Sequence, residues 1–205
     1  MNKILIATTN PAKKKELSAG LKKIEEKGIK LLYLDDFDIK DEPVENGSTF
    51  EENALLKAKF YADKTGLPTI ADDGGLLIYA LDGEPGVKSR RWPGYEATDE
   101  ELIKLALQKL EGIKYNDRTA RLQTCVCFYN PESDEHFCEE ENIEGYIAED
   151  RLEIESDGYP YRVLFIVKKY DKYYDEMTDE EHGKLNHRLI ALGRILGKIK
   201  KSLLQ

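Results

Sequence analysis

The 205-residue chain has no long hydrophobic run and no excess of basic residues. No apolar stretch approaches the roughly 20 residues that a membrane-spanning helix needs, so we expect no membrane segment. The apolar start, Met1 to Ala7, is too short for the core of a signal peptide, which predicts a cytoplasmic protein. The net charge of −9 argues against a nucleic-acid-binding protein, which would present a basic surface. An acidic chain with local clusters of Lys and Arg fits a small anionic ligand better.

Cysteine is also scarce, with three in the chain. Cys125 and Cys127 alternate within an apolar run, so we interpret them as packed residues of a strand. Together with Cys138 they lack a fourth ligand at a spacing typical of zinc sites, which argues against bound zinc.

Hydrophobic periodicity divides the chain into helices and strands with no repeat or low-complexity linker. Helices are expected at about 12–27, from Thr49 to Gly66, at 99–111 and at 187–204. Strands are expected at 3–8, 29–34, 69–72, 76–81, 118–129, 136–148 and 161–168, with an acidic loop over 35–48. This order predicts an α/β fold: one domain over residues 1–205, with an elongated mixed sheet flanked by helices and two lobes around a cleft.

The segment Thr8-Thr9-Asn10-Pro11-Ala12-Lys13 joins the first expected strand to the first helix. Helix N-termini present unpaired N–H groups and a partial positive charge, which suit phosphate, and Lys13 adds a full charge. The Gly-Lys-Ser/Thr of a Walker phosphate loop is missing. An ordinary capped helix with solvated lysines remains an alternative for this segment.

Asp72 and Asp73 are expected at the end of a strand, before Gly74 and Gly75. Paired carboxylates are suitable ligands for Mg²⁺, and a carboxylate there can also deprotonate an attacking water. The glycines allow a nucleotide to approach the backbone closely. A polar turn without function is the alternative.

Two further groups complete the candidate site. Asn53 and Lys57 lie four residues apart on one helix face, where Lys57 could reach a phosphate and Glu45 a metal. His187 and Arg188 stand at the expected start of the last helix. For Asn53 and Lys57 the alternative is a solvated charged helix face. For His187 the alternative is a structural histidine.

The order and spacing of these motifs resemble the inosine/xanthosine triphosphate pyrophosphatase family over nearly the whole chain. The matching motifs are TxNxxK at 8–13, TFxENAxxKA at 49–58, ADDxGL at 71–76, GxPGVxSxR at 83–91 and a late HR at 187–188. The resemblance implies a homodimer of two-lobed α/β subunits that hydrolyses ITP, dITP or XTP to the monophosphate and pyrophosphate with Mg²⁺.

The resemblance also implies roles for individual residues. Glu45 and Asp73 would bind the metal, with Asp72 beside them, and Asp73 would accept the proton of the attacking water. The residues expected to contact the nucleotide are Thr8, Thr9, Asn10, Lys13, Asn53, Lys57, Gly74, Ser89, Arg91, Tyr159, Tyr161, Arg162, His182, His187 and Arg188.

Departures from the family pattern concentrate among the residues that would contact the purine. Where the family has Gly-Phe-Gly-Tyr-Asp-Pro, this chain has Gly158-Tyr-Pro-Tyr-Arg-Val163. Arg162 thus replaces a carboxylate, which only accepts hydrogen bonds, by a guanidinium, which only donates them. Asn186 stands for the usual Ser, His182 for a Lys, and Gly74 for a small hydroxyl residue.

Two hypotheses follow from these departures. The first is a working pyrophosphatase with an altered base preference, which the intact phosphate and metal residues favour. The second is a weak or inactive (d)ITP sensor that signals to a partner effector protein, for example in bacterial defence.

Overall fold

The structure is a computed structural model, and it describes residues 3–154 and 158–203. Its centre is a seven-stranded mixed sheet in the order β2-β1-β3-β4-β5-β6-β7. The strands are β1 (Lys3–Ile6), β2 (Lys30–Tyr33), β3 (Thr69–Ile78), β4 (Thr119–Asn130), β5 (Glu135–Ile147), β6 (Phe165–Val167) and β7 (Lys172–Tyr173). β1 pairs in parallel with β2 and β3, whereas β6 pairs antiparallel with β5 and β7.

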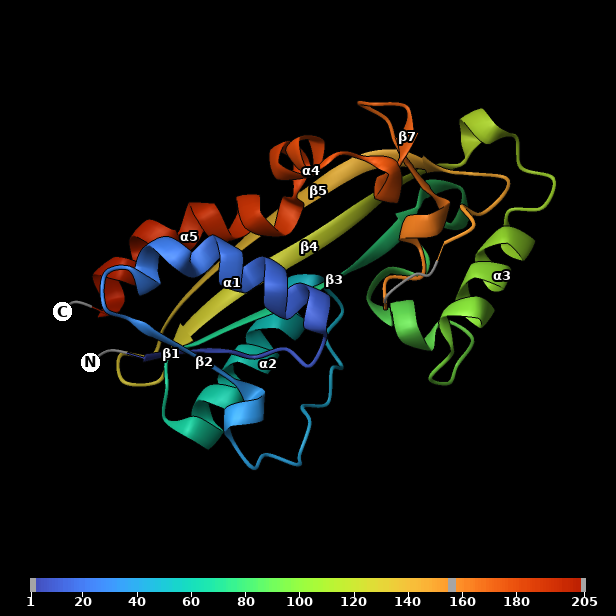
Figure 1. Ribbon diagram of the computed structural model, residues 1–205. Helices are drawn as coiled ribbons and strands as arrows, with labels where there is room; N and C mark the ends of the chain where they lie inside the picture. The colour runs from blue at the N-terminus through green and yellow to red at the C-terminus, as the bar shows by residue number, and fades with distance from the viewer. Residues whose placement is uncertain (1–2, 155–157, 204–205) are drawn as a thin grey trace. The chain divides into compact units, whose positions relative to one another are not determined.

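The helices are α1 (Pro11–Glu25), α2 (Phe50–Thr65), α3 (Asp99–Lys109), α4 (Asp179–Leu185) and α5 (His187–Leu203). Figure 1 shows them flanking the sheet, which confirms the predicted mixed α/β fold. The chain divides into two compact units, whose ranges split β3, β4 and β5. Unit 1 comprises residues 1–73, 124–141 and 187–205, and unit 2 comprises residues 74–123 and 142–186.

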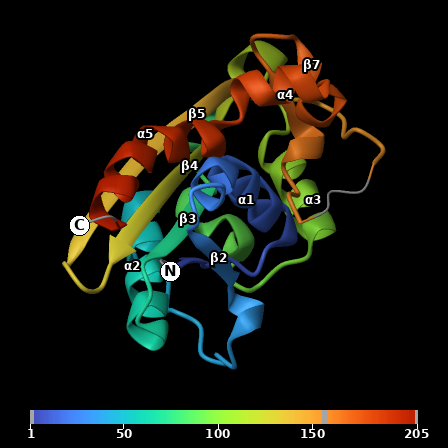
Figure 2. The ribbon, with the colours of Figure 1, turned by 60° about the vertical axis from the view of Figure 1, so that its left-hand side comes forward.

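Unit 1 has a hydrophobic layer on each face of its strands. Ile4 and Ile6 of β1 are buried with Leu17 and Leu21 of α1 and with Ile195 of α5. The alternate residues of β1, Leu5 and Ala7 just beyond it, are buried with α2 instead. This period of two follows from the alternation of side chains along a strand. Figures 1 and 2 both show α5 alongside α1 in this unit.

Unit 2 has its own core beneath α3. Leu102, Ile103 and Ala106 of that helix are buried with Leu76 of β3 and Phe165 of β6, among others. Thr98 caps α3 in a capping box: its hydroxyl accepts a hydrogen bond from the Glu101 N–H, and its own N–H donates to the Glu101 carboxylate. Each unit therefore buries a hydrophobic core of its own.

Two of the expected strands need correction, and two elements were missed. The strand carrying Asp72 and Asp73 does not end there but continues through both glycines to Ile78. The strand expected at 161–168 is reduced to Phe165–Val167, because Arg162–Leu164 form a 3-10 turn. Neither β7 nor α4 was expected.

Candidate active site

The loop after β1 is held as a helix N-terminus. Oδ1 of Asn10 accepts hydrogen bonds from the backbone N–H groups of Ala12 (2.9 Å) and Lys13 (3.2 Å). The backbone N–H of Asn10 in turn donates to Oγ1 of Thr8 at 3.2 Å. Pro11 occupies the first turn, where its missing N–H costs nothing. The cap thus fixes the position from which the Lys13 side chain extends.

Asp72 is the centre of a buried ionic cluster within unit 1. Its Oδ2 lies 3.0 Å from Nζ of Lys13 and 2.9 Å from Nε of Arg188. Arg188, which is 3% exposed, also pairs with Glu16 of α1. Burial disfavours ionisation of Asp72, but the charges of Lys13, Arg188 and Lys57 outweigh it and hold the pKa of Asp72 below its ordinary value. Asp72 is therefore a permanent anion at neutral pH.

The pKa of Asp73 is shifted in the opposite direction to that of Asp72. Burial raises its pKa above the ordinary value, and the nearby charge of Glu45 adds to this, although Lys57 and Lys13 oppose the shift. Nδ2 of Asn53 donates to its Oδ2 at 3.1 Å. Its backbone carbonyl accepts a bond from the hydroxyl of Thr124 at 3.1 Å. Asp72 and Asp73 are adjacent in sequence, yet Asp73 takes up a proton more readily than Asp72.

Lys57 and Asn53 of α2 connect the loop 45–48 to this cluster. Nζ of Lys57 lies 2.9 Å from Oε1 of Glu45 and donates to the Asp72 carbonyl at 3.1 Å. Burial lowers the pKa of Lys57, but Asp73, Glu45 and Asp72 outweigh it, so its pKa is raised. Oδ1 of Asn53 accepts from the Gly47 N–H at 2.8 Å. Glu45 is therefore held beside the carboxylate pair.

A pocket of about 90 Å³ opens beside these groups within unit 1. Its lining consists of Ala7, Thr8, Thr9, Leu34, Glu42, Pro43, Glu45, Lys57 and Tyr61. A water molecule takes up roughly 30 Å³ in the liquid, so the pocket can accommodate a phosphoryl group or a partly hydrated cation. Residues predicted to bind phosphate and residues predicted to bind metal thus line one space.

The residues expected around the purine include a compact aromatic group in unit 2. The Arg162 guanidinium lies over the Tyr159 ring at 3.5 Å and over the Tyr174 ring at 4.6 Å, measured to the centroids. His182 of α4 meets Tyr174 edge to face, with ring centroids 4.8 Å apart. Arg162 is therefore a stacked residue that contacts Tyr159 directly and is connected to His182 through Tyr174.

The remaining expected contacts in unit 2 lie elsewhere in that unit. The Tyr161 hydroxyl donates to the Ser89 carbonyl at 2.8 Å, and the Ser89 hydroxyl donates to Gly86 at 2.7 Å. Arg91 closes the 3-10 segment Gly86–Arg91, and Gly74 lies inside β3. Tyr161 thus anchors the segment that carries Ser89 and Arg91.

His187 and Arg188 begin α5 and are both buried in unit 1. The structure places Arg188 in contact with the carboxylates of Asp72 and Glu16, and its contact with the purine stays a prediction. Two residues of the cluster were not expected from the sequence, Glu16 and Thr124. Glu16 follows Lys13 by three positions on α1, a spacing that places both on one helix face and could have indicated it.

A family model described as the Ham1 family matches residues 4–198. The chain belongs to the Ham1 family. The relatives it resembles include proteins named dITP/XTP pyrophosphatase from Elusimicrobium minutum and Bacillus subtilis. The first is 41% identical over 97% of this chain and 100% of that protein, and the second is 39% identical over 95% and 96%. The family predicted from the motifs is confirmed.

Solved Ham1 structures support the fold. A HAM1 protein from Coxiella burnetii superposes with a TM-score of 0.83 at 32% identity, covering 98% of this chain and all of that one. A nucleoside-triphosphatase / dITP/XTP pyrophosphatase from Mycobacterium abscessus gives a TM-score of 0.77 at 34% identity, over 96% and 99%.

Other expectations stay predictions. The homodimer, the effector partner, the cytoplasmic location, the central cleft and the single-domain organisation are among them. Within residues 3–154 and 158–203, no helix is long and apolar enough to cross a membrane.

Proposed function

We propose that this Ham1 protein hydrolyses dITP- and XTP-type purine nucleoside triphosphates to the monophosphate and pyrophosphate, with Mg²⁺ as cofactor. Relatives that share about two fifths of its sequence over nearly their whole length carry names for this activity. The proposal also rests on the charged residues of unit 1, which combine phosphate-binding cations with metal-binding carboxylates.

The observation that carries the proposal is the opposed environments of Asp72 and Asp73. Lys13 and Arg188 hold Asp72 ionised, whereas burial raises the pKa of Asp73. Paired carboxyl groups whose pKa values are pushed apart are the usual sign of distinct roles in acid–base chemistry. We assign Asp73 as the proton acceptor for the attacking water. Asp72 positions Lys13 and Arg188.

The donor set fits a divalent cation. Glu45 and Asp73 offer carboxylate oxygens, the ligand type that Mg²⁺ prefers. Among the described residues, Oδ1 of Asp72 is buried and has no hydrogen-bond partner, so the site also holds an unused acceptor. When bound, Mg²⁺ would neutralise charge on the phosphates and on the leaving pyrophosphate.

The charge balance of the cluster supports the same conclusion. Four carboxylates (Glu16, Glu45, Asp72, Asp73) face three cations (Lys13, Lys57, Arg188). This net negative charge would repel a triphosphate, so phosphate binding calls for an added cation. Lys13 and Lys57 would then contact phosphate oxygens.

Base selection is the part of the function in which this protein departs from its family pattern. The Arg162 guanidinium covers one face of the Tyr159 ring, so that face is not open to a purine. A guanidinium at this position donates hydrogen bonds and would favour carbonyl oxygens on the base edge. We therefore propose a base preference shifted towards purines with more carbonyl groups, XTP above dITP.

Pyrophosphate release from a panel of ITP, dITP, XTP, ATP, GTP and dUTP with Mg²⁺ tests the proposal. We expect release from XTP and dITP, and a loss of about 100-fold or more in Asp73→Asn, as is typical for removal of a general base. Asp38→Asn is the matched control, because its side chain is 90% exposed. No release from any nucleotide would overturn the enzyme assignment. A thermal shift without release would instead support the sensor hypothesis.

The role of Arg162 has its own test. Arg162→Asp restores the residue type of the family pattern, and the ratio of kcat/KM for XTP to that for dITP should fall. An unchanged ratio would contradict the proposed base preference while leaving the hydrolysis itself intact.

A further inference from the structure

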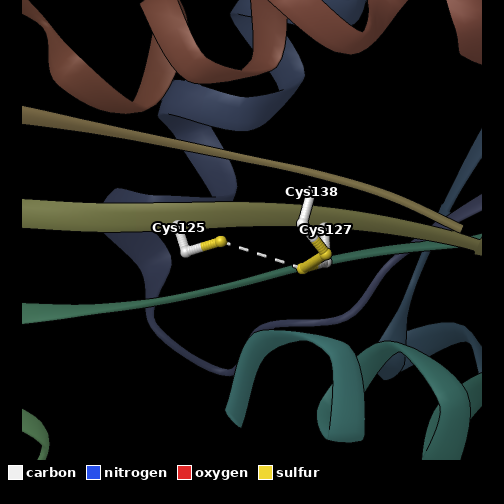
Figure 3. A group of neighbouring side chains, drawn as sticks. All are labelled: Cys125, Cys127 and Cys138. Carbon is white, nitrogen blue, oxygen red and sulfur yellow. Dashed lines mark hydrogen bonds between the residues drawn. A yellow bond between two sulfur atoms is a disulfide. The ribbon is translucent and has the colours of Figure 1, made fainter. Parts of the chain in front are cut away.

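Three cysteine sulfurs converge on the α2-facing side of the hairpin formed by β4 and β5. Cys125 and Cys127 are two residues apart on β4 and so share a face, and Cys138 lies across from Cys127 on β5. Their Sγ atoms all lie within 4.8 Å of one another (Figure 3). All three belong to unit 1, and none has a part in the proposed hydrolysis.

The spacing of these sulfurs suits a shared metal ion. Sγ of Cys125 lies 3.8 Å from Sγ of Cys127. Thiolates that bind one tetrahedral ion with Zn–S bonds of about 2.3 Å are themselves about 3.8 Å apart. Cys127 and Cys138 are joined as a disulfide in the structure, which is the oxidised state of the cluster. In that state two of the three sulfurs are unable to act as thiolate ligands.

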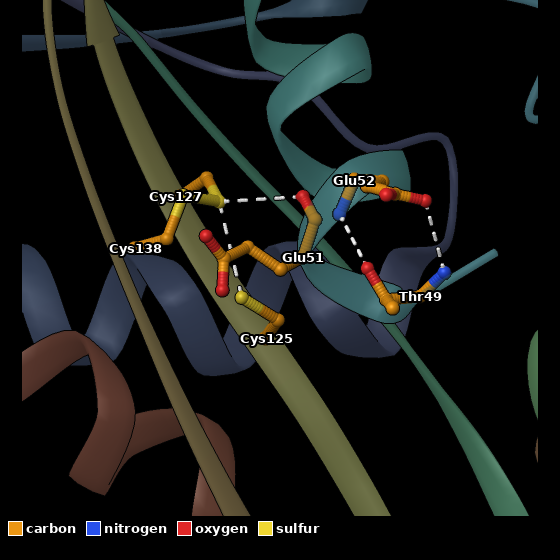
Figure 4. Close-up of a disulfide and its surroundings, with 6 residues drawn as sticks. All are labelled: Thr49, Glu51, Glu52, Cys125, Cys127 and Cys138. Carbon is orange, nitrogen blue, oxygen red and sulfur yellow. Dashed lines mark hydrogen bonds between the residues drawn. A yellow bond between two sulfur atoms is a disulfide. The ribbon is translucent and has the colours of Figure 1, made fainter. Parts of the chain in front are cut away.

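The surroundings of the cluster are acidic. Figure 4 shows Glu51, at the start of α2, with its carboxylate extending towards the sulfurs. Its backbone carbonyl lies 3.8 Å from Sγ of Cys127. The Glu51 carboxylate would therefore attract a cation towards the sulfurs.

Access to the cluster comes from its partly exposed members. Cys125 and Cys127 are fully buried, whereas Cys138 is partly exposed and Glu51 is exposed. An ion can thus arrive from solvent past Cys138 and Glu51 and exchange its water for sulfur. Soft thiolate ligands select ions such as Zn²⁺ and Cu⁺, in contrast to the oxygen ligands of the candidate Mg²⁺ site.

We propose that the reduced protein binds one soft d¹⁰ cation, for which Zn²⁺ is the reference, through Cys125, Cys127 and Cys138. The fourth position is filled by the Glu51 carboxylate or by water. A dithiol first supplies the two electrons and two protons that convert the disulfide into two thiols, and is itself oxidised to a disulfide. With a phosphine as reductant, water supplies the two protons and the oxygen of the phosphine oxide that forms. As three metal–sulfur bonds form, three thiol protons pass to solvent. Oxidation of Cys127 and Cys138 abolishes the site.

The test uses full-length, tag-free protein reduced with a phosphine under anaerobic conditions. Cd²⁺ titration is followed by the ultraviolet thiolate-to-metal absorption band, and Zn²⁺ binding by competition with a coloured chelator. We expect one ion per chain. Cys138→Ser should weaken binding by more than about 100-fold, since even loss of an outer-shell partner costs 10–100-fold. Protein carrying the disulfide should give no band.

Two control variants distinguish this site from the candidate Mg²⁺ site and from a loss of folding. Asp73→Asn should keep the absorption band and the affinity, because it removes an oxygen ligand of the other site. Cys125→Ala tests the buried member, and circular dichroism checks its folding. Should that variant not fold, Cys138→Ser decides alone, since its side chain is partly exposed. The proposal would be overturned if reduced wild-type protein gave no thiolate-to-metal absorption band, or if folded Cys138→Ser bound the ion with the affinity of the wild type.

Discussion

At the scale of single residues, the Asp72 side chain joins α1 and α5 through its pairs with Lys13 and Arg188. It neutralises Arg188, which is buried, and Lys13, whose side chain is 16% exposed, and Arg188 in turn links it to Glu16. A buried charge without a partner is strongly unfavourable, whereas a paired one is tolerated. The ionised Asp72 therefore stabilises unit 1 as well as the arrangement of its cations.

Asp72→Asn should destabilise the metal-free protein by about 3–5 kcal/mol at neutral pH, because it removes the buried carboxylate that pairs with Lys13 and Arg188. The pKa of Asp72 is depressed in the folded state, so its contribution is present above the unfolded value of about 3.9 and is lost as pH falls below it. Urea unfolding from pH 7 to pH 3 should show the difference between wild type and variant shrinking. A difference independent of pH would contradict this role of Asp72, and Asp38→Asn serves as control.

Gly47 determines how closely the loop of Glu45 approaches α2. A Cβ at Gly47 would lie 2.7 Å from Oδ1 of Asn53 and 2.8 Å from Cβ of Glu52. Gly47→Ala should therefore displace the loop, break the 2.8 Å bond from the Gly47 N–H to Asn53, and raise the Mg²⁺ concentration needed for half-maximal activity. Metal titrations of pyrophosphate release check this. Gly197→Ala, which meets nothing within 4 Å, should leave the Mg²⁺ requirement unchanged.

Sequence reasoning predicted Lys13, Asn53 and Lys57 as phosphate-binding residues because their spacing is local, and that role stays a prediction. Lys13 follows a helix cap, and Asn53 and Lys57 share a helix face. Both patterns can be recognised from residues only a few positions apart in sequence. The pairing of Arg188 with Asp72, 116 residues away in sequence, was not expected. Thr124 likewise meets the Asp73 carbonyl across 51 residues. Such long-range pairs depend on the tertiary fold and leave no periodic pattern.

At the scale of elements, regular hydrophobic patterns predicted the long helices and strands within a few residues. Short elements were missed. β7, for example, spans two residues, which is too few to show the alternation of apolar and polar side chains that marks a strand. α4 was missed although Thr178 and Glu181 form a capping box that the sequence displays. The 3-10 turn at Arg162–Leu164 replaced part of an expected strand because an apolar run alone does not fix backbone conformation.

Gly145 permits the close pairing of β5 with β6 in unit 2. It lies opposite Val167, and a Cβ there would collide with the Ile166 carbonyl and the buried Phe165 ring. Neither the Ile166 backbone nor the packed Phe165 ring can move far enough to make room for a Cβ. Gly145→Ala should therefore lower the free energy of unfolding by about 1–3 kcal/mol or more. Gly197→Ala, in the open helix position, should instead raise it by up to about 1 kcal/mol. Chemical denaturation measures both variants, and equal free energies of unfolding for Gly145→Ala and Gly197→Ala would contradict this prediction.

At the scale of the whole molecule, no feature of the sequence indicates that two units divide β3, β4 and β5 between them. The strands are continuous in sequence, so no linker composition marks the boundary, which lies directly after Asp73. The convergence of Cys138 on Cys125 and Cys127 was equally hidden, because it depends on the register of the hairpin. Sequence spacing alone argued against a shared metal site.

Ligand binding should stabilise the whole chain only when metal and triphosphate are present together. The cluster carries one more carboxylate than it has cations, so a triphosphate alone is repelled and Mg²⁺ alone lacks phosphate ligands. With both at about 100 times Kd, stabilisation of about 2.7 kcal/mol corresponds to a Tm increase of roughly 5–11 °C. A non-hydrolysable XTP analogue with and without Mg²⁺, in wild type and Asp73→Asn, measures the coupling by thermal unfolding. Additive shifts from the separate ligands would show that the cation is not needed to offset the carboxylates, and the charge argument would fail.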